Sequence, residues 1–176
     1  MHSKGYIHRD LKPANILLSI QKSTQSREKD GQVDITACRD CDNSTDRHTF
    51  ITPHIGDFGL AADYDPAADD SNTVMALVEG PTHLVGTKHY RPTTRRKICP
   101  KLDVYSLGII AFELVYPMST KSERLIVLGR LQDGVLPNEF KSHPMADGIL
   151  HMVSDRREDQ WSCGEVRAWL DDLLVR

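Results

Sequence analysis

A short segment near the start of the chain, the run HRDLKPANILL from His8 to Leu18, places an acid, a cation and an amide on one loop. The carboxylate of Asp10 could accept the proton of a hydroxyl group, and the ammonium of Lys12 could neutralise a phosphate. The amide oxygen of Asn15 is a ligand that Mg²⁺ accepts. The apolar residues that follow, Ile16 to Leu18, predict a strand that fixes one end of the loop. These residue types indicate a loop that holds a hydroxyl nucleophile beside a metal-bound phosphate.

A second acid stands in a similar setting farther along the chain. Asp57 opens the run Asp-Phe-Gly directly after an apolar strand end at Ile55-Gly56. Both motifs, in this order and with a strand between them, resemble the C-terminal lobe of eukaryotic protein kinases, which carries His-Arg-Asp-x-Lys-x-x-Asn and Asp-Phe-Gly. The resemblance covers essentially the whole chain except one polar insertion.

The resemblance implies ATP and Mg²⁺ as cofactors and a protein serine or threonine as the phosphate acceptor. Asp10 would orient the substrate hydroxyl and accept its proton, and Lys12 would neutralise charge on the transferred group. Lysine two residues after the aspartate resembles the Ser/Thr-specific version of the loop. Asn15 and Asp57 would ligate magnesium and so bind the nucleotide, and Leu17 would lie in the apolar floor under adenine.

Further roles follow from the same resemblance for residues beside the two acids. His8 and Phe58 would pack together and keep Asp57 pointed inward. Asp103 would hold the backbone of His8 and Arg9 from below. The resemblance thus implies that the catalytic loop is fixed by contacts from distant parts of the chain.

The activation segment is expected to span residues 57–94. Gly86 and Thr87 resemble the start of the substrate-binding loop, with the Thr87 hydroxyl near the catalytic acid and lysine. By the same analogy Thr82 is the phosphorylation site, and its added charge would pair with Arg9.

Three runs narrow the resemblance to one group of kinases. FELVYP at Phe112–Pro117, STKSER at Ser119–Arg124 and VGTKHY at Val85–Tyr90 resemble kinases that phosphorylate the alpha subunit of eukaryotic translation initiation factor 2. The implied function is stress-responsive control of translation, with that subunit as the protein substrate. Dimerisation would rest on parts of a full-length parent outside this chain. The implied substrate-docking residues open a helix and are Thr120, Glu123 and Arg124.

The expected fold class is α+β, a protein-kinase-like C-terminal lobe that is mainly helical with a few short strands and lacks the N-terminal lobe. One partial kinase domain would fill residues 1–176, with the catalytic loop at 8–18 and helices over 102–176. Residues 19–53 are dominated by Ser, Thr, Gln, Asp, Arg and Lys. Such a composition buries little apolar surface, so we expect a disordered insertion there.

The pattern of apolar residues predicts three helices over residues 102–176. Leu102 to Tyr116 is apolar on nearly every side, which predicts a core helix, and Asp103, Ser106 and Glu113 are its exceptions. Thr120-Lys-Ser-Glu123 is a capping box followed by apolar residues at helical spacing. A second capping box, Ser162-Cys-Gly-Glu165, precedes an apolar stripe formed by Val166, Trp169, Leu170, Leu173 and Leu174.

The glycine-rich loop, the strand lysine and its helix glutamate are not in this sequence, so the resemblance implies one wall of the nucleotide pocket is missing. We therefore expect the chain by itself to bind ATP poorly and to be inactive. The alternative from another functional class is a non-catalytic truncated kinase module that binds a substrate or a partner kinase.

The sequence also departs from the resembling kinases at a paired position. Arg91-Pro92-Thr93-Thr94 stands where Ala/Ser-Pro-Glu is usual, and Gln160 stands where an arginine is expected before the last helix. Loss of one partner would leave a buried charge unpaired, at a cost of about 3–5 kcal/mol. Loss of both avoids that cost and is consistent with a folded lobe.

Composition excludes several other classes. A net charge of −3 gives no reason to expect a nucleic acid partner, and the longest apolar run is too short to cross a bilayer. We expect a cytoplasmic protein, or one on the cytosolic face of a membrane if an anchor lies upstream. Cys38, Cys41, His48 and His54 could bind zinc, but their spacing is short for a zinc site, and we expect His54 to open the strand before Asp57.

Overall fold

A computed structural model of the protein describes residues 1–23, 48–64, 85–93 and 98–175. The chain divides into two compact units, which we call the helical unit (Met1–Asn15 with Asp57–Arg176) and the hairpin unit (Ile16–Gly56). In the part of the chain that the structure describes, no helix has the length and apolarity to span a membrane. Each unit is described by itself below.

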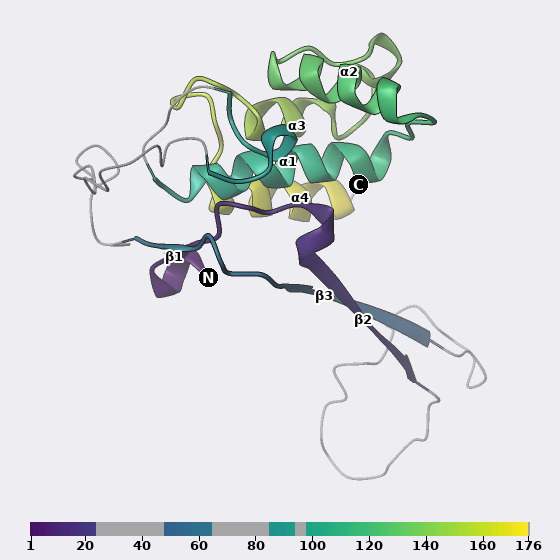
Figure 1. Ribbon diagram of the computed structural model, residues 1–176. Helices are drawn as coiled ribbons and strands as arrows, with labels where there is room; N and C mark the ends of the chain where they lie inside the picture. The colour runs from purple at the N-terminus through teal and green to yellow at the C-terminus, as the bar shows by residue number, and fades with distance from the viewer. Residues whose placement is uncertain (24–47, 65–84, 94–97, 176) are drawn as a thin grey trace. The chain divides into compact units, whose positions relative to one another are not determined.

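Four α-helices occur among the described residues of the helical unit: α1 (Lys101–Val115), α2 (Lys121–Gln132), α3 (Ala146–Met152) and α4 (Cys163–Val175) (Figure 1). Helix α1 is the core element, which confirms the prediction of a buried helix from Leu102 to Tyr116. Its buried apolar side chains lie on several faces and are Val104, Tyr105, Ile109, Ile110 and Phe112. Short strands complete the unit, so the prediction of a mainly helical architecture is confirmed.

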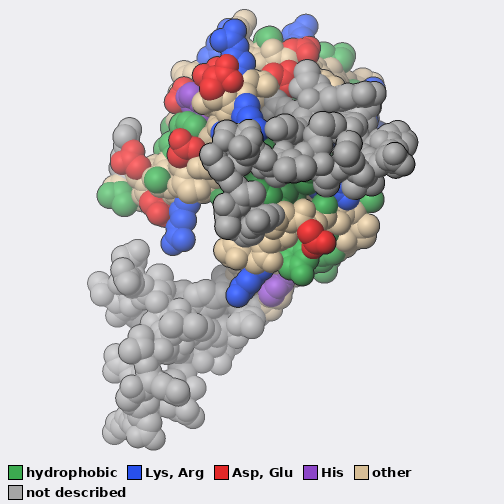
Figure 2. All heavy atoms as spheres, turned by 90° about the vertical axis from the view of Figure 1, so that its left-hand side faces the viewer, with side chains coloured by type: hydrophobic (Ala, Val, Ile, Leu, Met, Phe, Trp, Pro, Cys, Tyr) green, Lys and Arg blue, Asp and Glu red, His purple; other side chains and the backbone are tan. Residues whose placement is uncertain are grey.

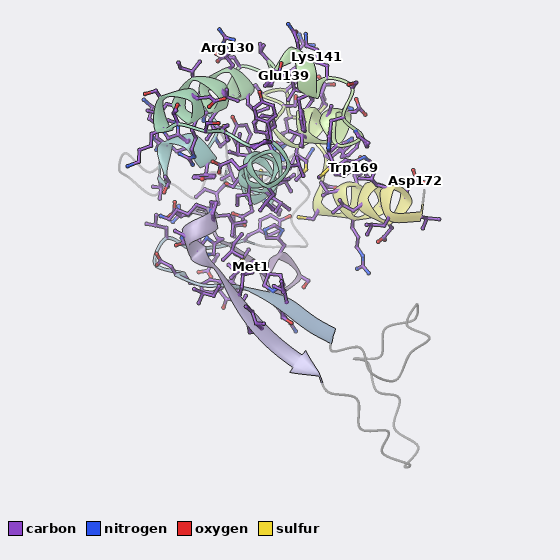
Figure 3. All side chains as sticks on the ribbon, turned by 90° about the vertical axis from the view of Figure 1, so that its right-hand side faces the viewer. Met1, Arg130, Glu139, Lys141, Trp169 and Asp172 are labelled. Carbon is purple, nitrogen blue, oxygen red and sulfur yellow. The ribbon has the colours of Figure 1, made fainter. Side chains whose placement is uncertain are left out.

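Helices α1, α3 and α4 share one apolar cluster. Val104 of α1, Met152 of α3 and Val166 of α4 are buried against each other, and Trp169 packs against them from α4 (Figure 3). Gly108 lets α1 and α3 approach closely, because a Cβ there would lie 2.7 Å from the Met152 Cβ. Since α3 is only seven residues long, its sequence pattern is too short to have predicted it.

Both predicted capping boxes are present. The Thr120 hydroxyl accepts from the Glu123 amide at 3.0 Å while the Glu123 carboxylate reaches back to the Thr120 amide at 3.4 Å. Ser162 and Glu165 exchange the same pair of bonds at the start of α4. These bonds satisfy amide groups that a helix start leaves without partners, so the two starts are fixed locally by sequence.

The apolar stripes of α2 and α4 are buried only in part. Leu128 and Leu131 of α2 are fully buried, whereas Leu125 and Ile126 are exposed. On α4, Leu174 is 83 % exposed, so the predicted stripe does not pack along its whole length. Helix α2 therefore carries an apolar face that the described residues of this chain leave open.

Two short strands link the segments that carry the acids. β1 (Tyr6–Ile7) pairs antiparallel with β4 (Ala62–Asp63), with Tyr6 opposite Asp63 and Ile7 opposite Ala62. β1 leads directly into the His-Arg-Asp loop, and β4 follows the Asp-Phe-Gly turn. This ladder brings the two motifs into one region of the helical unit.

The hairpin unit consists of β2 (Ile16–Ser23) and β3 (His48–Ile55), paired antiparallel from Ile16 opposite Ile55 to Ser23 opposite His48. Residues 19–23 and 48–53, which lie at the two ends of the segment predicted to be a disordered insertion, are paired in these strands. Isoleucine, threonine and phenylalanine favour strands even in a polar segment, and Pro53 is tolerated because a two-stranded sheet has only edges. Residues 24–47, including Cys38 and Cys41, lie outside the described residues.

Acidic and basic side chains alternate over the described part of the face in Figure 2, in line with the small net charge of −3. Charged groups of both signs lie on the helical unit there. This face is thus typical of a solvated surface rather than of a nucleic acid interface.

Gln160 occupies the position where the resembling kinases carry an arginine. Its side chain is 2 % exposed, and its Nε2 donates to the carbonyl oxygens of Lys101 at 2.9 Å and Met152 at 2.8 Å. The Lys101 ammonium in turn donates to the Gln160 carbonyl at 2.6 Å. A neutral amide thus joins α1, α3 and the segment before α4.

We expect Gln160→Met to lower the free energy of unfolding by about 2 kcal/mol, because two buried carbonyl groups lose their donor. The measurement is urea unfolding followed by circular dichroism. Glu158→Met is the matched control, since Glu158 is exposed in the same segment and should change stability by less than about 0.5 kcal/mol. Equal stability of the two variants would contradict the structural role of Gln160.

Candidate active site

Asp10 is the centre of a hydrogen-bonded cluster. Its carboxylate accepts from Lys12 Nζ at 2.7 Å, from the Thr87 amide at 2.7 Å and from the Thr87 hydroxyl at 2.8 Å. Lys12 Nζ also donates to the Thr87 hydroxyl at 3.0 Å. Asn15 Nδ2 donates to the Asp10 carbonyl oxygen at 2.9 Å. The sequence-predicted acid, lysine, amide and threonine therefore lie together although Thr87 is far along the chain.

Gly86 is what allows Thr87 to reach Asp10. Its φ of 97° lies in the left-handed region, and a Cβ at this position would collide with the carbonyl oxygen of Arg9. Only glycine fits both the backbone angle and the close approach. The activation segment therefore touches the catalytic loop backbone to backbone at this position.

The environment of Asp10 keeps its carboxyl group ionised. Burial alone would raise the pKa of Asp10, but the hydrogen bonds from Lys12 and Thr87 oppose that effect and hold the pKa below its usual value. Asp10 as a whole residue is 8 % exposed, so a small group can still reach its carboxylate. Such a carboxylate can accept a hydrogen bond, and later a proton, from a hydroxyl placed beside it.

Asn15 and Asp57 each carry an oxygen atom that could ligate a magnesium ion. Because Asn15 Nδ2 is held by Asp10, its amide oxygen is the atom left to face a ligand. Asp57 follows β3 with a φ of 60°, and Oδ1 accepts weakly from the Gly59 amide at 3.4 Å. Among the described residues no group of three His, Cys, Asp or Glu side chains could hold a metal ion. Two protein oxygens fit Mg²⁺, which commonly binds one or two protein ligands together with substrate phosphates.

A buried carboxylate on α1 fixes the backbone of the catalytic loop. Asp103 accepts from the amides of His8 and Arg9, both at 2.8 Å, and from His2 Nε2 at 2.8 Å. Arg9 has a φ of 66°, an uncommon angle for a residue with a side chain. The expected contact of Asp103 with the His8-Arg9 backbone is confirmed, and it explains how this backbone angle is maintained.

The side chains of the loop make two further contacts. The ring of Phe58 packs edge-on against the His8 ring, with ring centres 5.1 Å apart. Arg9 Nε donates to the Leu60 carbonyl oxygen at 2.6 Å. The predicted packing of His8 with Phe58 is therefore present. The segment that begins with the Asp-Phe-Gly turn contacts the catalytic loop through Phe58 and through the carbonyl group of Leu60.

For two further predicted site residues, the described structure does not test the expected role. Leu17 lies in β2 of the hairpin unit with 61 % of its surface exposed. Thr82 lies outside the described residues, so its expected pairing with Arg9 is not described either. The adenine-floor role of Leu17 and the phosphorylation of Thr82 stay predictions.

The three predicted docking residues form the start of α2 and its attachment to α1. Thr120 and Glu123 are used by the capping box described above. Arg124 Nε donates to Glu113 at 2.5 Å and its Nη2 donates to the Tyr90 hydroxyl at 2.6 Å. These contacts orient α2 from inside the protein, and contact of the same residues with a substrate stays a prediction.

Tyr90, Glu113 and Arg124 form an anchor that we name the Tyr90 triad. The Tyr90 hydroxyl donates to Glu113 at 2.5 Å. Burial, and then the neighbouring Glu113 carboxylate, raise the pKa of Tyr90, so the phenol remains protonated as a donor. Gln132 supports the same region by donating to the carbonyl oxygens of Lys88 and Arg91.

Sequence reasoning missed the anchoring roles of Tyr90, Glu113, Gln132 and His2. One signal was available, since Glu113 is an acid within an otherwise apolar helix and such a residue needs a partner. The partner itself, Arg124 on the next helix, could not be read from spacing.

Comparison with known proteins places these motifs in a family. The chain matches the family described as "Protein kinase domain" over residues 1–126. That range includes the whole Asp10 cluster, Asp57, α1 and the first half of α2.

Relatives share most of this chain. It is 33 % identical over 162 residues to "Eukaryotic translation initiation factor 2-alpha kinase 2" of Schizosaccharomyces pombe, covering 82 % of this chain and 24 % of that protein. It is 36 % identical over 151 residues to human "eIF-2-alpha kinase GCN2", covering 78 % and 7 %. It is 30 % identical over 175 residues to "Eukaryotic translation initiation factor 2-alpha kinase pek-1" of Caenorhabditis elegans, covering 94 % and 14 %. The chain thus spans less than a quarter of the length of each of these proteins.

The His2–Asp103 ion pair generates a pH prediction. The hydrogen bond that His2 donates to the Asp103 carboxylate, with a second contribution from the contact with Cys163, raises the pKa of His2 from 6.5 to about 9. A raised pKa stabilises the fold below pH 6.5, and this contribution is lost as pH rises through about 9. At pH 6 we expect His2→Gln to lower the free energy of unfolding by on the order of 1–2 kcal/mol, and solvent screening of this partly exposed pair keeps the loss that small. At pH 10 the loss should be much smaller.

Urea unfolding of both proteins between pH 6 and pH 10 measures this difference. His54→Gln, which removes an imidazole from the hairpin unit, is the matched control and should show no such pH dependence. A constant cost of His2→Gln across the range would contradict the ion pair.

Proposed function

The chain belongs to the protein kinase family, and from that premise we propose that it transfers the terminal phosphoryl group of ATP to a serine or threonine of a protein substrate. The observation that carries the proposal is the Asp10 cluster, in which one ionised carboxylate is held by Lys12, Asn15 and Thr87. A structural role alone does not require a lysine, an amide and a hydroxyl to converge on one acid.

The residues of the cluster divide the work of phosphoryl transfer between them. Asp10 would accept a hydrogen bond from the substrate hydroxyl, orient its lone pair and take its proton as the bond to phosphorus forms. Lys12 lies 2.7 Å from that carboxylate, so its ammonium would be next to the transferred group and offset its charge. Thr87 holds both side chains and belongs to the segment that would position the substrate backbone.

Asn15 and Asp57 would hold magnesium through the Asn15 amide oxygen and the Asp57 carboxylate. The bound ATP-magnesium complex supplies the phosphoryl group and neutralises charge on its oxygens. The donor set supports this assignment because both side chains offer oxygen and neither offers sulfur or nitrogen as the free ligand.

We further propose the alpha subunit of translation initiation factor 2 as the substrate. The relatives described above are named as kinases of that subunit, and the runs Ser119–Arg124 and Val85–Tyr90 resemble that group. The exposed face of α2, with Leu125 and Ile126, is the surface on which such a substrate would dock. This role would place the protein in the cytoplasm or on the cytosolic face of a membrane.

A second candidate function is a non-catalytic module that binds the same substrate. The observation that favours it is the exposed pair Leu125 and Ile126 on α2, because such a docking face can bind a substrate whether or not phosphate is transferred. The two functions separate when the chain is joined behind the N-terminal lobe of a relative such as the Schizosaccharomyces pombe kinase. Phosphate transfer by this chimera supports the catalytic function, and its complete inactivity with intact substrate binding supports the module.

In the chimera, we expect Asp10→Asn to lower kcat by roughly 10²–10⁴-fold, because the base is lost while the amide still fits the site. Transfer of labelled phosphate to the initiation factor subunit measures the effect. Asp171→Asn, an exposed acid on α4, is the matched control and should leave kcat unchanged. Activity of Asp10→Asn within twofold of the parent would overturn the assigned role.

Arg124→Ala tests the docking helix. Loss of the Tyr90 triad should let α2 shift, so we expect kcat/KM on the initiation factor subunit to fall about tenfold or more, equivalent to about 1.4 kcal/mol. The value for a short peptide substrate that does not reach α2 should change little.

The matched control is Arg130→Ala, because Arg130 lies on the same helix and points away from the unit (Figure 3). Equal losses on both substrates would show that Arg124 supports the whole lobe rather than docking.

A further inference from the structure

A second cluster of reactive side chains lies outside the Asp10 cluster. The Cys163 sulfur is 3.3 Å from His2 Nδ1, and His2 Nε2 is 2.8 Å from the Asp103 carboxylate. The three residues come from the start, the middle and the end of the chain. Their order in space is thiol, imidazole, carboxylate.

This order is the one that activates a nucleophile. A thiol within hydrogen-bond reach of an imidazole can pass its proton to that ring, and a carboxylate on the other ring nitrogen orients the ring and stabilises its charge. Both ring nitrogens of His2 are engaged, so the ring has one orientation. The thiolate is the form of a cysteine that reacts with electrophiles.

Two more features of Cys163 support reactivity. It is exposed, whereas Cys99, the other free cysteine among the described residues, is buried. It is also the first residue of α4, a helix of 13 residues, and the amide end of a helix favours negative charge. No step of the proposed phosphoryl transfer uses this thiol, so that proposal does not explain the cluster.

We propose that Cys163 is a modification site for small electrophiles, peroxides in particular, and that His2 and Asp103 couple it to the catalytic loop. With hydrogen peroxide, the thiolate sulfur attacks one peroxide oxygen, and the S–O bond forms as the O–O bond breaks. The hydroxide that leaves takes a proton from the His2 imidazolium and becomes water. The sulfur is oxidised by two electrons to a sulfenic acid, and the peroxide is reduced.

The coupling follows from the shared carboxylate. Asp103 holds the amides of His8 and Arg9 as well as His2. Oxidation removes the negative charge that faces His2, so one of the two contacts that favour the charged imidazole is lost and the ion pair with Asp103 weakens. The backbone of the catalytic loop should then open more often. This inference does not depend on the proposed phosphoryl transfer.

Alkylation of the full chain by iodoacetamide at pH 7, followed by peptide mass spectrometry, tests the site. We expect Cys163 to react about tenfold or more faster in the parent chain than in His2→Gln, and faster than in the urea-unfolded parent. His54→Gln should leave the rate unchanged. A parent rate no higher than that of the unfolded chain would overturn the proposal even if His2→Gln failed to fold.

Peroxide treatment tests the coupling. Dimedone, which traps sulfenic acids, should label Cys163 in the parent, and hydrogen exchange of the peptide that contains His8 and Arg9 should then speed up. Cys163→Ser should show neither effect, since serine keeps the size of the side chain without the reactive sulfur. Labelling without any change in exchange would overturn the coupling, and absence of labelling would overturn the peroxide reaction.

Discussion

The carboxylate of Asp103 is the constraint on which the candidate active site depends. A buried charge is costly unless it is fully hydrogen-bonded, and this one accepts from two backbone amides and one imidazole. Because Asp103 lies on α1, the core helix, the catalytic loop takes its position from the best-packed element of the protein. The positive φ of Arg9 is held by the same bonds, and Asp10 follows directly after it.

The same logic extends along α1. The sequence shows three polar exceptions in this apolar helix, Asp103, Ser106 and Glu113, and together they hold three other segments of the chain. Ser106 donates to the Tyr90 carbonyl oxygen at 2.6 Å, and Glu113 binds the Tyr90 hydroxyl and Arg124. The catalytic loop, the end of the activation segment and the docking helix are therefore all attached to one helix, α1.

The sequence predicts the elements whose causes are local. The capping boxes, the apolar core helix and the cluster of Asp10, Lys12 and Asn15 all rest on residues close in the chain. It could not predict contacts such as Cys163 with His2, because nothing in either local pattern names a partner so far away. The strand ends at residues 19–23 and 48–53 were missed for a similar reason: their polar composition predicts disorder, but backbone pairing between the two segments provides the hydrogen bonds that composition does not reveal.

Gln160 shows how such a tertiary arrangement can change without loss of the fold. In the resembling kinases an ion pair would lie here, and a charge left alone by the loss of its partner would be strongly destabilising. A neutral amide avoids this because it needs only carbonyl acceptors, and the backbone of Lys101 and Met152 provides two. The position therefore keeps its role of joining helices, and it does so with an uncharged side chain. The end of the activation segment has contacts of its own. That segment is then held from α1 by Ser106 and Glu113 and from α2 by Gln132, so these uncharged and paired contacts carry the positioning of Thr87 against Asp10.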